Sequence, residues 1–139
     1  MNYHIYCVRG NHEQRPELIK SMILVNDENV NNVVYMEEAF PNIRYFVDGN
    51  IYNLLGYKCL VIGGAYSVDK WYRLARAGYT RDEAETADPK KCGWFKDECL
   101  TAAEMATIMQ EVKGKSVDFI LSHTCPLSWE PTDLFLNGI

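Results

Sequence analysis

Two side chains of the kind that bind divalent cations stand together near the start of the chain. Asn11 and His12 follow an apolar stretch, residues 3–8, and lie between Gly10 and Glu13. An Asn carbonyl oxygen and a neutral His nitrogen both bind divalent cations, and Gly10 permits a tight turn with close approach of a substrate. The alternative is an ordinary turn with an exposed histidine, which is the more frequent meaning of an isolated Asn-His pair.

A second histidine has a similar context. His123 follows the apolar residues 117–121 and precedes Pro126, 111 positions (123 − 12) after His12. A lone loop histidine is more often bonded locally than a ligand, but the matching contexts favour both histidines lining one cleft. Because both apolar stretches are apolar on two faces, we expect residues 3–8 and 117–121 to form neighbouring strands inside one sheet.

Local patterns predict the elements that would position these residues. Strands are expected at residues 3–8, 33–36, 44–47, 51–55, 58–62 and 117–121, with 51–55 and 58–62 forming a hairpin. Helices are expected at residues 16–25, 69–77 and 101–112, the last opened by a capping box of Thr101 and Glu104. Residues 26–32 and 79–97 are expected to be loop or irregular. Strands dominate the first half and helices separate the later ones, so the predicted fold class is α/β or α+β.

Composition restricts the classes of partner. The 139 residues include 14 basic and 19 acidic side chains, a net charge of −5. This acidic balance argues against broad binding to nucleic acid or to anionic membranes. No apolar run approaches the ~20 residues that span a bilayer, and the first residues lack the features of a secretory signal. Five cysteines without paired spacing favour reduced thiols. We therefore expect a cytoplasmic protein.

Three segments, taken in order, carry a family resemblance. RGNHE (residues 9–13), CLVIGGAYSVDKWYRLA (59–75) and LSHTCPLSWEPT (121–132) resemble the calcineurin-like metallophosphoesterases, in the bacterial and phage branch related to Ser/Thr protein phosphatases. The resemblance extends over residues 3–139. It implies the central portion of the metallophosphoesterase β-sandwich, two sheets flanked by helices, as one incomplete domain over residues 1–139.

The resemblance also implies roles for five residues. Asn11 and His123 would ligate the second of two divalent metals (Mn, Fe, Zn or similar), and His12 would be the general acid beside the scissile phosphate. Gly10 and Glu13 would support the loop, although Glu13 as a solvated charge is an equal alternative. In the complete family site, a hydroxide held by two metals attacks the phosphorus of a phosphomonoester or phosphodiester, while the acid protonates the leaving oxygen. The phosphorylated substrate is not identified by these residues.

The sequence departs from the family pattern in its metal ligands. The family's D-x-H, G-D-x-x-D and G-H-x-H segments are absent, and two neutral ligands make a poor Mn or Fe site. We therefore expect a domain truncated at both ends that binds metal partially at most and is inactive as this chain. The alternative function is a non-catalytic chain. Because missing strands would leave sheet edges and apolar faces uncovered, we expect a homo-oligomer.

Two further groups of side chains have alternative interpretations. Ser67 near Asp69 suggests nucleophilic catalysis, but no histidine is close in sequence, so a loop role is favoured. Lys70, Arg73 and Arg76 lie along the helix predicted at residues 69–77. They form either a modest phosphate-facing patch or, more commonly, a solvated helix face.

Overall fold

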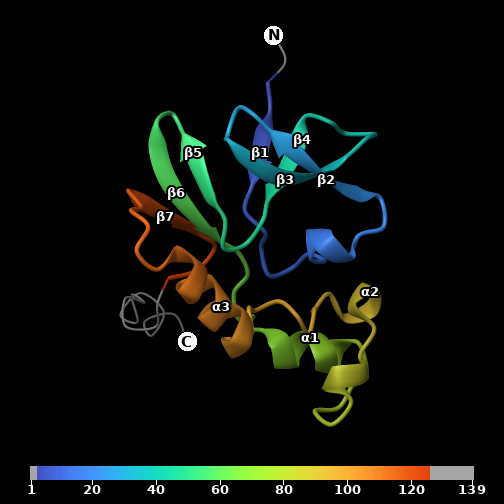
Figure 1. Cartoon of the computed structure of the whole chain (residues 1–139). Coiled ribbons are helices and arrows are strands. Elements are labelled where there is room, and N and C mark those ends of the chain that lie inside the picture. Colours follow the sequence, from blue (N-terminus) through green and yellow to red (C-terminus); the bar gives the residue numbers. More distant parts are fainter. Residues whose placement is uncertain (1–2, 126–139) are drawn as a thin grey trace, which may run out of the picture.

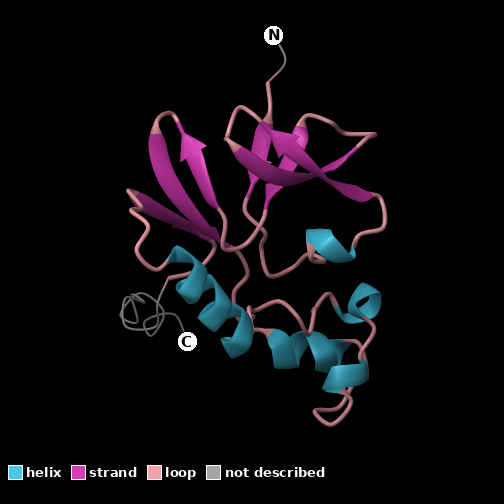
Figure 2. Cartoon of the chain, in the orientation of Figure 1, coloured by secondary structure: helices cyan, strands magenta, loops and turns pink. Residues whose placement is uncertain are grey.

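The computed structural model describes residues 3–125, and two β-sheets lie on one side of a layer of short helices (Figures 1 and 2). The four-stranded sheet has the order β1-β4-β3-β2, and the three-stranded sheet has the order β5-β6-β7. In both sheets one pair is parallel, β1 with β4 and β6 with β7, and the other pairs are antiparallel. This mixed content agrees with the predicted α+β class.

The element bounds follow the chain in order. The strands are β1 (Ile5–Cys7), β2 (Met22–Asp27), β3 (Asn32–Glu37), β4 (Ile43–Phe46), β5 (Ile51–Leu54), β6 (Tyr57–Ile62) and β7 (Phe119–Ser122). The α-helices are α1 (Lys70–Arg76), α2 (Pro89–Cys92) and α3 (Ala102–Val112), and two short 3₁₀ segments are η1 (Pro16–Leu18) and η2 (Ala84–Thr86).

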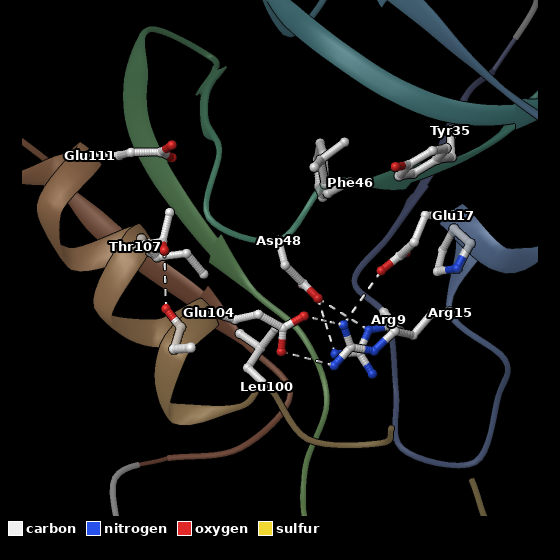
Figure 3. A pocket seen from close by; sticks show the side chains of 14 residues that line it. Arg9, Arg15, Glu17, Tyr35, Phe46, Asp48, Leu100, Glu104, Thr107 and Glu111 are labelled. Atoms are coloured by element: carbon white, nitrogen blue, oxygen red, sulfur yellow. Dashed lines mark hydrogen bonds and ion pairs between the residues drawn. The ribbon is translucent and has the colours of Figure 1, made fainter. Parts of the chain in front are cut away.

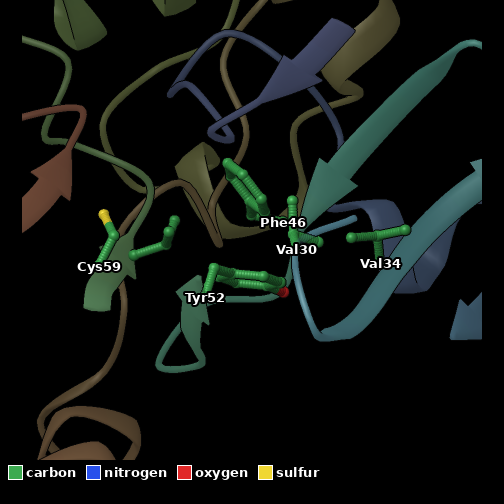
Figure 4. Packing of buried hydrophobic residues seen from close by; sticks show 6 residues of the cluster. Val30, Val34, Phe46, Tyr52 and Cys59 are labelled. Carbon is green, nitrogen blue, oxygen red and sulfur yellow. The ribbon is translucent and has the colours of Figure 1, made fainter. Parts of the chain in front are cut away.

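The main hydrophobic core lies where the two sheets face each other (Figure 4). The rings of Phe46 and Tyr52, one from each sheet, have centroids 4.3 Å apart. The Tyr52 hydroxyl donates to the carbonyl of Val33 at 2.7 Å and accepts from the amide of Val47 at 2.8 Å, so its polar end is satisfied inside the core. The buried members of this cluster are Val30, Val34, Phe46, Tyr52, Cys59 and Val61.

A second, smaller core holds the helical layer together. It consists of Leu74, Ala84, Cys92 and Trp94, so α1 packs against the segment that contains η2 and α2. Within residues 3–125, a helix with the length and apolar character needed to cross a membrane is not found.

Several predicted elements are confirmed. The strands expected at residues 33–36, 44–47, 51–55 and 58–62 correspond to β3 through β6, and the hairpin is the antiparallel pair β5–β6. The capping box opens α3, because the Thr101 hydroxyl oxygen accepts from the Glu104 amide at 3.2 Å and the Glu104 carboxylate accepts from the Thr101 amide at 2.7 Å. Residues 79–97, expected to be irregular, contain η2 and the four-residue helix α2.

The helix predicted at residues 16–25 is wrong. Only η1 is helical, and the apolar residues that follow it form β2, paired with β3 in a hairpin over the segment predicted as loop. The connecting turn is stabilised locally, since the Asn29 amide donates to the Asp27 carboxylate at 3.0 Å and Asn31 adopts a positive φ of 56°. Cross-strand pairing with β3 therefore outweighs the helical spacing of the apolar residues.

The predicted neighbourhood of the first and last strands is also wrong. β1 pairs with β4 and β7 pairs with β6, so the two strands lie at the edges of different sheets. Neither is buried on two faces: Ile5 is 58% exposed and Ile120 is 59% exposed. An apolar pattern on both faces of a strand predicts burial only where the fold places another layer over each face. The described residues supply no such layer over β7.

One buried side chain connects the two sheets to the helical layer. The Arg9 guanidinium follows β1 and is 1% exposed. Its Nε and Nη2 donate to the Asp48 carboxylate at 3.1 and 3.0 Å, and Nη1 donates to the Glu98 carbonyl at 2.8 Å. The other Asp48 oxygen accepts from the Gly63 amide at 2.6 Å, and the Gly64 amide donates to the Arg9 carbonyl at 2.8 Å. The ends of β1, β4 and β6 and the loop before α3 thus meet at Arg9.

Gly64→Ala is expected to destabilise the fold much more than Gly56→Ala. Both glycines have a positive φ, 76° and 91°, which costs Ala about 1–2 kcal/mol. A Cβ at Gly64 would also lie 2.2 Å from the Glu98 carbonyl oxygen and 2.6 Å from Arg9 Nη2, whereas nothing lies within 4 Å at Gly56. Such overpacking adds about 1–3 kcal/mol. Urea unfolding of both variants measures the difference, and equal losses would contradict the Arg9 packing described above.

Candidate functional site

The two loops singled out in the sequence meet in the structure. Asn11 Oδ1 lies 3.0 Å from His123 Nε2, across 112 positions of sequence. Although β1 and β7 belong to different sheets, both deliver their loops to the same place. The His123 amide donates to the Ile62 carbonyl at 3.2 Å, which extends the β6–β7 ladder by one residue and fixes the backbone that carries the imidazole. The two loops therefore lie together, and the lining of one cleft by His12 and His123 stays a prediction.

A chain of hydrogen bonds fixes the orientation of the Asn11 amide. Asn11 Nδ2 donates to Ser67 Oγ at 3.0 Å, and Ser67 donates through its hydroxyl to Glu98 Oε2 at 2.5 Å and through its amide to Glu98 Oε1 at 2.9 Å. Because an ionised carboxylate only accepts, the Ser67 proton points to Glu98 and its lone pair faces Asn11. The amide nitrogen of Asn11 is thus held toward Ser67, and its oxygen is left facing His123.

Ser67 and Glu98 were not predicted to belong to the site. Ser67 is 1% exposed and Glu98 is 4% exposed, so Ser67 is a buried positioning group, which agrees with the favoured loop role. The sequence signal for Ser67 was its position shortly after the glycine pair Gly63 and Gly64. Glu98 lies between the segment predicted to be irregular (79–97) and the helix predicted at 101–112, and nothing in the neighbouring residues distinguishes it from a solvated acid.

Glu13 holds the loop that carries Asn11. Its carboxylate accepts from the Gly10 amide and, at 3.1 Å, from the Tyr45 hydroxyl of β4. Burial raises the pKa of Tyr45 to about 12, and the nearby charge of Glu13 adds to this effect. Glu13 is half-buried with two partners, so it is not the solvated charge of the alternative interpretation. Gly10 also approaches the imidazole, because a Cβ there would lie 3.6 Å from His123 Nε2.

His12 is exposed and, among residues 3–125, has no hydrogen bond or ion pair. It follows Asn11 directly and precedes Glu13, so its backbone is fixed between two anchored residues while its imidazole remains open to solvent. The role of general acid stays a prediction. The residues expected to continue the His123 segment from Pro126 onward lie outside the described residues.

The Asn11–His123 pair fits one cation. Two adjacent ligands of an octahedral ion, each about 2.1 Å from the metal, lie about 3.0 Å apart, which is the separation of Asn11 Oδ1 and His123 Nε2. Without a cation, the same contact is a hydrogen bond from a protonated Nε2. The part of the chain that the structure describes contains no group of three or more His, Cys, Asp or Glu side chains suited to a metal. The two-metal centre that the resemblance implies stays a prediction.

A cavity of about 410 Å³ lies between the first sheet, η1 and α3 (Figure 3). Arg9 and Arg15 project into it, but Asp48 and Glu104 neutralise them, with Arg15 Nη1 2.6 Å from Glu104. The hydrogen bond from Arg15, with others from Thr101, lowers the pKa of Glu104 to about 2. Both arginines of this cavity are thus already paired, so it offers little positive charge to a phosphate.

Comparison with protein-family models, with curated proteins and with solved structures finds no match for this chain. The functional assignment therefore depends on the residues and on their geometry.

Ser67→Ala is expected to reduce the free energy of unfolding by about 1–3 kcal/mol, because the buried Glu98 carboxylate loses a donor. Ser116→Ala is the matched control: Ser116 is exposed and, within the described part of the chain, its hydroxyl accepts only from the Lys58 ammonium, so a change within about 0.5 kcal/mol is expected. Chemical denaturation of both variants measures the difference. Equal stability of the two variants would show that the hydrogen-bond chain does not organise the site.

Proposed function

We propose that this chain is a metallophosphoesterase of the calcineurin-like type, in which Asn11 and His123 bind one divalent cation. The observation that supports this most directly is the 3.0 Å contact between Asn11 Oδ1 and His123 Nε2. Asn11 and His123 come from two of the segments that carry the family resemblance, and the fold brings them into contact. The buried Ser67 and Glu98 orient the Asn11 oxygen toward His123. The proposed fold is the central portion of the metallophosphoesterase β-sandwich, and the core between two sheets supports it.

The proposed chemistry assigns different tasks to neighbouring residues. A cation held by this pair would neutralise charge on a phosphoryl oxygen of the bound ester. His12, exposed beside Asn11, would donate a proton to the leaving oxygen, a step worth typically ~10²–10⁴ in rate. Gly10 permits the close approach of His123, whose Nε2 would lie 3.6 Å from a Cβ there, and Glu13 keeps the loop in place through Tyr45. The substrate class is a phosphate ester.

The ligand count limits what this chain does alone. Two neutral ligands bind Mn or Fe weakly, and the second cation of a two-metal centre has no ligand group among the described residues. We therefore propose weak binding of a single cation and little or no turnover by this chain by itself.

Cation binding tests the proposal directly. His123→Ala is expected to weaken Co²⁺ or Mn²⁺ binding by at least roughly tenfold, and Asn11→Asp is expected to strengthen it by adding an anionic oxygen. Calorimetry gives the affinities, and the visible spectrum of Co²⁺ reports the ligand environment.

His4→Ala is the matched control, since it removes a histidine whose Nε2 lies 3.5 Å from Arg44 and outside the site. An equal loss of affinity in both histidine variants would contradict the proposed ligands. Hydrolysis of an aryl phosphate with Mn²⁺ is measured on the same preparations. Robust turnover that His12→Ala abolishes would show that other residues complete the centre, and would overturn the expected inactivity of this chain.

A non-catalytic oligomer is the second candidate, and the exposure of β7 favours it. Phe119, Ile120 and Leu121 are 42%, 59% and 39% exposed, and among the described residues β7 pairs on one side only. An apolar edge strand of this kind recruits another chain through backbone hydrogen bonds and apolar burial.

Light scattering is expected to report a homo-oligomer at micromolar concentration. Ile120→Lys is expected to shift the mass toward the monomer, because a charge on an edge strand blocks pairing. Met109→Lys, on the exposed face of α3, is the control that should leave the mass unchanged. A monomeric wild-type chain, or dissociation by both substitutions, would refute the edge-strand interface.

A further inference from the structure

A basic cavity lies between α1 and α2, in the helical layer. Its volume is about 430 Å³, within the range of about 300–1,000 Å³ that is usual for small-molecule sites. Four basic side chains line it, Arg73, Arg76, Lys90 and Lys91, and one acidic side chain, Asp69. None of these residues contributes to the Asn11–His123 site or to the Arg9 interactions.

The positive charge of this cavity is largely unneutralised. Asp69 pairs with Arg73 at 2.6 Å, and no other ion pair within residues 3–125 involves Arg76, Lys90 or Lys91. The formal charge of the lining is thus +3 (four basic minus one acidic), on a chain whose net charge is −5. Basic residues in a last helical turn also complement the helix dipole, which is worth at most about −0.5 charge per helix. The dipoles of α1 and α2 together therefore offset about one of the three positive charges, which leaves the cavity an excess of about +2.

One cationic side chain of the cavity, Arg73, is held in a fixed orientation. Arg73 Nε donates to Asp69 at 2.6 Å, and Nη1 lies 3.4 Å from the Gly93 carbonyl. Gly93 ends α2 with a φ of 68°, and a Cβ there would lie only 3.1 Å from Nη1, so the close approach of the guanidinium favours glycine. A fixed guanidinium surrounded by flexible ammonium groups suits phosphate recognition.

Lys70 does not belong to this group, which corrects the patch considered from the sequence. Its ammonium lies over the rings of Trp71 and Trp94, at 4.7 and 4.1 Å from their centroids. The basic side chains that line the cavity together with Arg73 and Arg76 are instead Lys90 and Lys91, in the segment predicted to be irregular.

We propose that this cavity binds two adjacent phosphate groups of a small phosphorylated molecule. A phosphate monoester carries about −1.5 to −2 charge at neutral pH, so two phosphate groups match the charge of the lining better than one. The cavity volume suits a small molecule rather than a polymer. This site is separate from the proposed cation site, and its binding requires neither a cation nor hydrolysis.

Inorganic pyrophosphate is the probe, titrated calorimetrically into the full chain at low ionic strength with EDTA present, so that cation binding does not contribute. Binding is expected to be tighter for pyrophosphate than for orthophosphate and to weaken with added salt. The double variant Arg76→Gln/Lys91→Gln is expected to bind pyrophosphate at least roughly tenfold more weakly. Lys20→Gln/Lys113→Gln removes the same charge from exposed positions outside the cavity and is expected to change the affinity less than about twofold.

Circular dichroism of each variant establishes that the fold is retained. If the double variant Arg76→Gln/Lys91→Gln does not fold, Lys91→Gln alone is tested in its place. Equal weakening in both double variants would overturn the proposal, because it would show a general charge effect. Tighter binding of a single-stranded oligonucleotide than of pyrophosphate would overturn it in favour of a polymeric ligand. Loss of cation binding in His123→Ala, with pyrophosphate binding retained, separates this site from the proposed hydrolytic one.

Discussion

The buried ion pair of Arg9 and Asp48 is the constraint on which the arrangement of the sheets and loops depends. A charged side chain can be buried only if its donors are satisfied, and one left unpaired in such a place costs several kcal/mol. Arg9 meets this condition with donors to Asp48 and to the Glu98 carbonyl. Four segments must therefore be in position before the guanidinium is stable, and the same four segments hold Asn11 in place and support His123, which follows β7.

Glu98 connects this structural role to the candidate site. Its backbone carbonyl accepts from Arg9, while its side chain holds Ser67, which in turn holds the Asn11 amide. The orientation of the Asn11 oxygen, a ligand only of the proposed cation, is thus determined by a residue 87 positions away (98 − 11) that does not touch it. Orientation through such hydrogen-bonded partners is common around metal ligands, and it lowers the entropy lost when a ligand binds.

The sequence correctly predicted elements that depend on interactions between residues close together in the chain. The Thr101 capping box and the β5–β6 hairpin depend on residues a few positions apart, and both are present. The helix predicted at residues 16–25 is wrong because β3, the next strand along the chain, offers backbone hydrogen-bond partners that the helical spacing of the apolar residues does not reveal. The matching contexts of His12 and His123 pointed to the two loops, and the family resemblance named Asn11 together with His123. The sequence did not point to Ser67 and Glu98 as their supports, since burial alone distinguishes these two from ordinary polar residues.

The long reach of the Arg9 interactions also has a consequence for how the chain folds. Its partners lie 39 and 89 positions away, and the Asn11–His123 contact spans 112. Closing loops of this length costs conformational entropy before the contacts stabilise the chain, so the folding rate of such topologies is low. The β5–β6 hairpin and α3, which are local, can form early, whereas the candidate site needs contacts that close much longer loops. During this delay the apolar residues of β7 are open to pairing with other newly made copies of the chain, and they stay exposed in the folded structure.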